Sequence, residues 1–177
     1  MERWNVFPCR GDRAGFYLLN KNRTSVKINS RCSWFDIGAF LAALEEAQFP
    51  LKFTDGLDLI NFTYIAKGRM YGRYSDDTIE IDIRFARRQA TIVDTFVHEV
   101  AHHIDSENDI SSILTAERKL CGRYVHSYAR GSDDEYLARG FELFYSHDPR
   151  RRRRLRLHCP HLYRVIQRLD RRYRKDQ

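Results

Sequence analysis

The 177-residue chain lacks any long apolar run. No stretch approaches the ~18–20 consecutive apolar residues that a membrane-spanning helix requires, so we expect no such helix and no membrane partner. The first ten residues, MERWNVFPCR, contain no hydrophobic segment, which predicts the absence of a secretory signal peptide. We therefore expect a cytoplasmic protein, although export without a leader would leave no mark in the sequence.

Cysteine is scarce and widely spaced. The four cysteines are Cys9, Cys32, Cys121 and Cys159, and they form no CxxC pair. This spacing is not that of a cysteine-based zinc cluster or of a dense disulfide framework. Free thiols, the default in a reducing compartment, are expected.

Acidic residues are rare in the C-terminal part. Residues 150–177 contain twelve Lys and Arg against two Asp, a net charge of +10, whereas residues 1–149 carry −3. Arg150 to Arg154 form an unbroken run that can bind nucleic acid or another anionic surface. Apolar residues recur beyond this run, and Pro160 can begin a helix. We therefore favour a packed basic C-terminal helix over 150–177, with nucleic acid as the less favoured partner.

The order of expected elements predicts the fold class. Length and composition indicate one domain over residues 1–177. Strand patterns fall at 16–19 and 26–28, as a hairpin, and at 59–65 and 78–83. Helices are expected over 34–48, from Thr91 onward, over 109–122, over 132–146 and in the tail. The apolar side of the helix over 109–122 would consist of Ile110, Ile113, Leu114 and Leu120.

These elements describe an α+β domain, with a small, mostly antiparallel sheet in the N-terminal half and a helical C-terminal half. Alternation in 78–83 places Ile79, Ile81 and Ile83 on one face. We expect this strand at the edge of the sheet near a cleft, where its free backbone groups could pair with an extended peptide.

One motif carries chemistry. His98, Glu99 and His102 spell HExxH inside the apolar periodicity that begins at Thr91. Residues four apart lie on one helical face, about 5–6 Å apart at Cβ, so two imidazoles can converge on one zinc ion. Glu99 would reach the zinc-bound water as a general base without ligating the metal.

Two neighbours of the motif, His103 and Asp105, each have more than one possible role. His103 points away from the other two histidines and is expected to be exposed or to support a ligand from behind. Asp105 lies one turn after His102, where it could accept the other N–H of an imidazole and orient the ring. It could equally be an ordinary carboxylate near the end of the helix.

A catalytic zinc normally has three protein ligands and a water. Glu135 and Glu142 are seven residues apart and so share about the same face of the helix expected at 132–146. Ser132 and Glu135 also fit a capping box, which would engage Glu135 with the backbone. Spacing alone leaves several candidates for the third ligand: His126, Asp133, Asp134, Glu135, Glu142 and His147.

The stretches HEVAHHID and EYLARGFELFYSHDP, with Tyr128 between them, resemble the catalytic domain of anthrax lethal factor and its relatives, zinc metallopeptidases of the gluzincin type. The resemblance runs from about Thr78 to the C-terminus and implies a zincin-like fold. It implies that Glu135 is the third zinc ligand, because Ala138 and Phe141 stand at the positions of the Ala and the Phe that follow the ligand Glu in the family. It also places Tyr128, seven residues before that Glu, as the acid or oxyanion donor.

Asp105 matches an Asp of the same family, whereas two positions depart from it. Arg139 stands where the family often has an acidic residue, and it could pair with Glu135 or support it from behind. Gly140 replaces a larger residue inside a helix, at a cost of roughly 1 kcal/mol relative to Ala. Glu142 is kept as the alternative ligand.

The resulting hypothesis is a zinc-dependent endopeptidase that hydrolyses peptide bonds of a protein substrate, with one zinc held by His98, His102 and Glu135. Glu99 would take a proton from the zinc-bound water, and Tyr128 would stabilise the oxyanion. Two alternatives are a zincin-like domain that has lost catalysis, with Arg139 and Gly140 as signs of drift, and a basic nucleic-acid-binding protein.

Overall fold

The structure is a computed structural model that describes residues 6–8, 16–19, 24–29, 35–65, 71–84 and 89–175. Its strands are β1 (Val6–Pro8), β2 (Phe16–Leu19), β3 (Thr24–Ile28), β4 (Leu59–Thr63), β5 (Gly72–Ser75) and β6 (Thr78–Asp82). Its α-helices are α1 (Ile37–Glu46), α2 (Gln89–Asn108), α3 (Thr115–Val125), α4 (Asp133–Phe144), α5 (Pro149–His158) and α6 (Pro160–Lys175). Short 3₁₀ helices are η1 (Leu51–Thr54), η2 (Ser111–Leu114) and η3 (Tyr128–Arg130).

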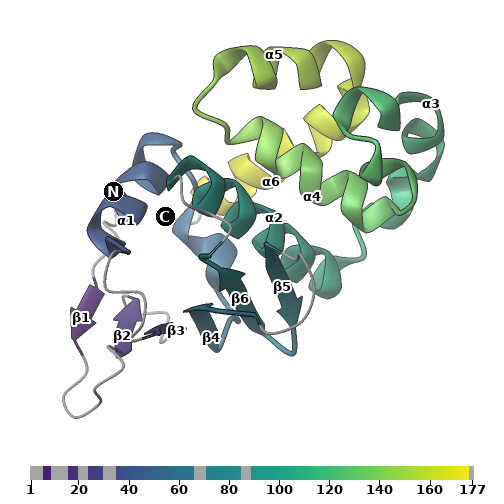
Figure 1. The fold of residues 1–177 in the computed structure, drawn as a ribbon. Coiled ribbons are helices and arrows are strands. Elements are labelled where there is room, and N and C mark those ends of the chain that lie inside the picture. Colours follow the sequence, from purple (N-terminus) through teal and green to yellow (C-terminus); the bar gives the residue numbers. More distant parts are fainter. Residues whose placement is uncertain are drawn as a thin grey trace.

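The described chain is α+β, as expected, with a helical C-terminal half (Figure 1). The sheet has the order β1-β2-β3-β4-β6-β5. The expected hairpin is confirmed, because β2 and β3 pair antiparallel. The described sheet is mixed: three of its pairings, β1 with β2, β2 with β3 and β5 with β6, are antiparallel, and β4 pairs parallel with both β3 and β6. The parallel pairings arise because α1 connects β3 to β4 and because β5 lies between β4 and β6 in the sequence.

The edge strand near the site is β5, not β6. The expectation that 78–83 forms the edge is therefore wrong: β6 lies between β4 and β5. The predicted alternation is confirmed, since Ile79, Ile81 and Ile83 are all fully buried. The sequence of β5, Gly-Arg-Tyr-Ser, carries no apolar alternation and gave no strand signal. A tight turn at Asp76 and Asp77, both with positive φ, returns β5 along β6.

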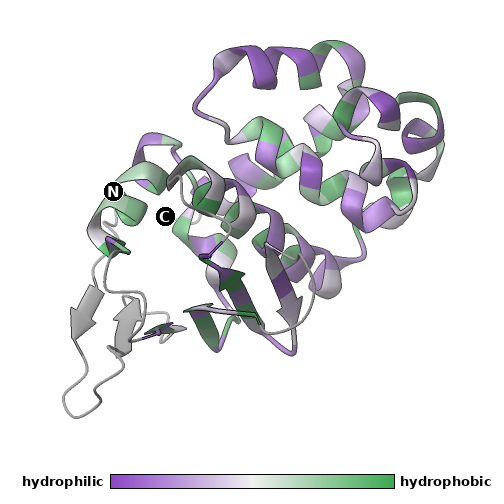
Figure 2. Cartoon of the chain, viewed as in Figure 1, coloured by the Kyte–Doolittle hydropathy of each residue, from purple (hydrophilic) through white to green (hydrophobic). Residues whose placement is uncertain are grey.

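The long helix α2 lies between the sheet and the C-terminal helices (Figure 1). Its apolar stripe from Val93 to Ile104 is buried, as the periodicity predicted. Phe96 from this stripe packs edge-on against Phe40 and Phe49, with ring centroids 5.3 and 5.9 Å apart. The hydropathy colouring shows the same division, with apolar segments turned toward the interior (Figure 2). This core fixes the orientation of the helix that carries the HExxH residues.

The stretch after α2 departs from the single helix expected over 109–122. Asp109 has a left-handed φ of 48°, which ends α2, and η2 precedes α3. A 3₁₀ helix has about three residues per turn, so the apolar positions lose their helical phase. Leu114 is buried as expected, but Ile113 and Leu120 are exposed.

The basic tail forms two helices instead of one. Asp148 caps α5 by accepting a hydrogen bond from the Arg150 N–H at 2.9 Å, and Pro149 occupies the first turn. Cys159 leaves helical geometry, and Pro160 begins α6 as expected. Most arginines of the run are exposed, and α5 is largely hydrophilic in Figure 2.

Cys121 and Cys159 are free thiols, whereas Cys9 and Cys32 lie outside the described residues. Among the helices of the described part of the chain, none combines the length and apolar character needed to cross a membrane.

Gly140 is explained by helix packing. It lies on α4 where α6 crosses, and a Cβ at this position would stand 2.7 Å from Leu162 Cδ2 and 3.0 Å from Ile166 Cδ1. Both neighbouring side chains are fully buried. Glycine therefore allows α4 and α6 to approach closely, and its departure from the gluzincin pattern has a structural cause.

Candidate metal centre

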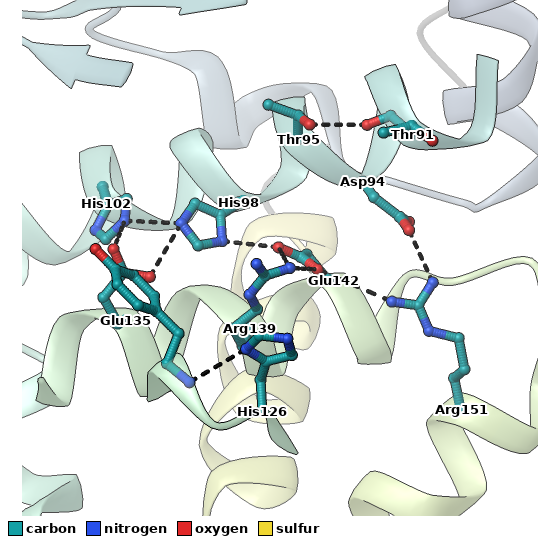
Figure 3. A network of polar contacts seen from close by, with 11 residues as sticks. Thr91, Asp94, Thr95, His98, His102, His126, Glu135, Arg139, Glu142 and Arg151 are labelled. Atoms are coloured by element: carbon teal, nitrogen blue, oxygen red, sulfur yellow. Dashed lines mark hydrogen bonds and ion pairs between the residues drawn. The ribbon is translucent and has the colours of Figure 1, made fainter. Parts of the chain in front are cut away.

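Two helices bring three ligand-type side chains together. His98 and His102 project from α2, and Glu135 projects from the first turn of α4 (Figure 3). The Nε2 atoms of the two histidines are 3.1 Å apart. Glu135 Oε2 lies 3.3 Å from His98 Nε2, and Glu135 Oε1 lies 3.8 Å from His102 Nε2.

This geometry fits a metal ion. Ligand atoms about 2.0–2.1 Å from a tetrahedral zinc stand roughly 3.3 Å from one another, close to the observed spacings. Glu135 Oε2 is buried and has no hydrogen-bond partner in the described part of the chain. Its nearest charged neighbour is the His98 ring at 3.3 Å, a spacing at which one cation can bind both atoms. The three residues could therefore hold a metal ion.

The other candidates for the third ligand have different surroundings. Glu142 accepts a hydrogen bond from the opposite nitrogen of His98, Nδ1, at 2.8 Å. Asp134 Oδ2 is 3.9 Å from His102 Nδ1. Of the remaining candidates, Asp133 pairs with Thr115 and Arg118, His147 lies 3.9 Å from Glu46, and His126 accepts from the Tyr128 N–H.

The capping explanation for Glu135 is not observed. Ser132 is the N-cap residue of α4, but its side chain makes no cap hydrogen bond. Three acidic residues, Asp133 to Glu135, fill the first helical turn, where the helix dipole favours negative charge. The local sequence thus starts the helix, while the packing of α4 on α2 directs Glu135 toward the histidines.

Arg139 pairs with Glu142, not with Glu135. Its Nη1 donates to both Glu142 oxygens, at 2.8 and 2.6 Å. Glu142 is buried, with 5% of its side chain exposed. The competition of Arg139 for Glu135 that the sequence allowed is therefore not seen.

Glu99 is buried against the edge strand β5. The backbone N–H of Tyr74 donates to its carboxylate. A Cβ on Gly72 would stand 2.6 Å from Glu99 Oε1 and from Thr95 Cγ2, so only glycine fits there without displacement. Strand β5 therefore both borders the site and holds the carboxylate.

The buried setting shifts three pKa values. Burial by itself lowers the pKa of His98, but contacts with Glu135 and Glu142 outweigh it and raise the pKa to about 9. Burial raises the pKa of Glu99 to about 7, against the opposing charge of His98. Burial and the His98 charge lower the pKa of His102. A carboxyl group with a pKa near 7 can both accept and release a proton at neutral pH.

An open cavity of about 860 Å³ lies over these residues. Its wall includes β5, the exposed face of α2 and Glu135 with Arg139 on α4. Tyr128 in η3 also lines the cavity, and 64% of the residue is exposed. Its phenol is thus accessible from the cavity rather than packed in the core.

The structure shows the contacts of the two residues next to the motif, His103 and Asp105. His103 is buried, not exposed: its ring contacts the Asp55 carbonyl at 2.8 Å and the Tyr74 hydroxyl at 3.3 Å. It therefore fastens α2 to η1 and β5. Asp105 accepts a hydrogen bond from the Ser111 N–H at 2.7 Å and so holds the segment after α2, while the carboxylate that contacts an imidazole directly is Glu142.

Sequence reasoning missed Asp94 and Arg151. Arg151 Nη1 donates to Asp94 Oδ2 at 2.8 Å, and its Nη2 lies 3.9 Å from Glu142 Oε2 (Figure 3). Asp94 lies four residues before His98, a spacing that places it on the same face of α2. Arg151 is hidden in the arginine run, where nothing distinguishes it from its neighbours.

Comparison of the chain with protein-family models, with curated proteins and with solved structures found no match.

Proposed function

We propose that this protein is a zinc-dependent endopeptidase that hydrolyses peptide bonds within an extended segment of a protein substrate. The observation that carries the proposal is the convergence of His98, His102 and Glu135 next to the buried Glu99. The two histidines and Glu99 come from one helix, whereas Glu135 lies 33 residues beyond His102, so local sequence preference does not explain the cluster. Two imidazoles and one carboxylate are a set of protein ligands known for catalytic zinc.

In this proposal His98, His102 and Glu135 hold the zinc. Zinc bound there would supply Lewis-acid chemistry, namely a water molecule with a pKa near 7 and a polarised substrate carbonyl. Glu99 accepts a proton from the attacking water and then delivers it to the leaving amine. Its buried position beside His98 and His102 supports this role.

Tyr128 would donate a hydrogen bond to the oxyanion that develops on the carbonyl. Its exposure to the cavity supports this role, because a packed phenol could not reach a substrate. The substrate would lie along β5, whose outer edge has no partner strand in the described sheet. An extended peptide can add to such an edge by main-chain hydrogen bonds.

The alternative of a zincin-like domain without catalysis rested on Arg139 and Gly140. Arg139 has a partner in Glu142, and Gly140 accommodates α6. Neither residue therefore requires loss of catalysis.

The decisive experiment replaces the general base alone. Glu99→Gln should keep zinc and fold, because Glu99 is no ligand, and should abolish cleavage of unstructured proteins or of a peptide library. Glu45→Gln on the exposed face of α1 makes the same charge change away from the site and serves as the control. Equal cleavage by the wild type and Glu99→Gln would rule out this mechanism.

A further inference from the structure

Glu142 is a buried carboxylate that contacts the candidate metal centre from behind. Its Oε1 accepts from His98 Nδ1 at 2.8 Å, on the side of the ring opposite to Nε2. Arg139 Nη1 donates to both of its oxygens. Figure 3 shows Glu142 between the imidazole and the two arginines, Arg139 and Arg151.

The arginines compensate the buried charge. An isolated carboxylate in a protein interior is strongly unfavourable unless opposite charges and hydrogen bonds surround it. Arg139 supplies a short contact from one turn earlier on α4, and Arg151 approaches from α5 at 3.9 Å. Arg151 is itself held by Asp94 on α2. The contacts therefore link α2, α4 and α5 around Glu142.

This arrangement determines how the His98 ring is held. A hydrogen bond at Nδ1 fixes the rotation of the ring and leaves Nε2 free to bind a cation. The same Nε2 faces His102 Nε2 at 3.1 Å and Glu135 Oε2 at 3.3 Å. Without Glu142, the imidazole would lose the contact that aims Nε2 at the other two ligand atoms.

We infer that Glu142 is a positioning residue for His98, and that Arg139 and Arg151 act on the metal centre through Glu142. The inference rests on the proposed function, because it needs a metal bound by His98. It gives one member of the arginine run a specific task, whereas Arg153 is exposed on the same helix and does not line the cavity.

Zinc affinity, measured by competition with a chelator, tests this role. Glu142→Gln removes the negative charge that binds His98 and both arginines, and should weaken zinc binding by roughly 10–100-fold, the usual effect of mutating a carboxylate that orients a metal-bound histidine. Arg139→Gln and Arg151→Gln should cause smaller losses in the same direction. Arg153→Gln, with the same charge change on α5, should leave the affinity unchanged.

Two further measurements separate positioning from a purely structural role. The visible spectrum of the Co²⁺-loaded protein reports ligand geometry and should change in Glu142→Gln but not in Arg153→Gln. If Arg139 acts through Glu142, the double variant should bind zinc as Glu142→Gln alone does, to within about twofold. If Glu142→Gln does not fold, the zinc affinities of Arg139→Gln and Arg151→Gln are compared with that of Arg153→Gln, and both should be lower.

The outcomes are distinguishable. A wild-type protein that binds no zinc would refute the proposed function before any variant is compared. A wild type that binds zinc, with Glu142→Gln or the arginine variants binding equally well, would overturn only the positioning role. A lower melting temperature of the metal-free variants with unchanged zinc affinity would likewise show that the contacts serve packing alone.

Discussion

The backbone of Gly72 touches the side chain of Glu99. A Cβ at position 72 would stand 2.6 Å from Glu99 Oε1 and 2.9 Å from Glu99 Cγ, closer than non-bonded atoms approach. Tyr74, two residues further along β5, donates its backbone N–H to the same carboxylate. The strand that would receive substrate therefore also sets the position of the proposed general base.

Gly72→Ala should separate catalysis from metal binding. The added methyl group must push Glu99 or β5 aside, and a displacement of about 1 Å at a reacting group can cost about 10²-fold in rate. We expect a loss of that order in kcat/KM with zinc content unchanged, because the three atoms nearest to the new methyl group belong to Glu99 and Thr95, which are not proposed ligands.

Gly122→Ala on α3 is the matched control, since its Cβ would meet its nearest neighbour at an ordinary 3.4 Å. It should retain activity. Full activity in Gly72→Ala would show that the placement of Glu99 against β5 does not matter for turnover.

Tyr128→Phe addresses the oxyanion. A phenol that donates only as charge develops on the carbonyl matters more in the transition state than in the ground state. The variant should lower kcat by about 10²–10³, while KM and zinc content barely move. Steady-state kinetics on a cleaved peptide would measure both constants, and near-normal kcat would remove Tyr128 from the mechanism.

Gly140→Ala should destabilise the protein, although the same change in an exposed helix stabilises it by roughly 1 kcal/mol. The new methyl group would stand 2.7 Å from Leu162 Cδ2 in a packed interface, and overpacking costs about 1–3 kcal/mol. We expect a net loss of about 1 kcal/mol in the free energy of unfolding, measured with denaturant. Adding Leu162→Ala should change the effect of Gly140→Ala, because the two residues share one contact.

Asp82 should make stability depend on acid pH. It is fully buried and accepts from the Ile65 N–H at 2.9 Å and from Arg84. Burial alone would raise its pKa, but these hydrogen bonds outweigh burial and lower the pKa below its usual value. A lowered folded-state pKa stabilises the fold above the unfolded-state value of about 3.9, and this stabilisation is lost as the pH falls through the folded-state pKa.

Thermal melts of the wild type and Asp82→Asn across pH 2–7 would therefore converge at the acid end. A gap between the two melting temperatures that stays constant over this range would contradict the ionic role of Asp82.

Local sequence patterns predicted the elements that carry their own signal. The spacing of Val93 to Ile104 identified α2, and the alternation of Ile79, Ile81 and Ile83 identified β6. The placement of β6 within the sheet could not be read, because the partner strand β5 is polar and short. Register and order in a sheet depend on contacts between distant segments, which periodicity does not encode.

The same limit applies to the site. HExxH is local, and a helix suffices to bring His98 and His102 together. The choice between Glu135 and Glu142 depends on how α4 packs on α2, so spacing left it open and only the gluzincin resemblance favoured Glu135. The turn between α4 and α5 brings Arg151 near Glu142. The run of five arginines does not indicate which of them makes this contact.

The most direct measurement is the metal content of freshly purified protein, wild type and Glu135→Ala. We predict about one zinc per chain in the wild type and little in Glu135→Ala, together with thermal stabilisation of the metal-free wild type by added zinc. Absence of zinc from the wild type, with no stabilisation when zinc is added, would contradict a metal centre formed by His98, His102 and Glu135.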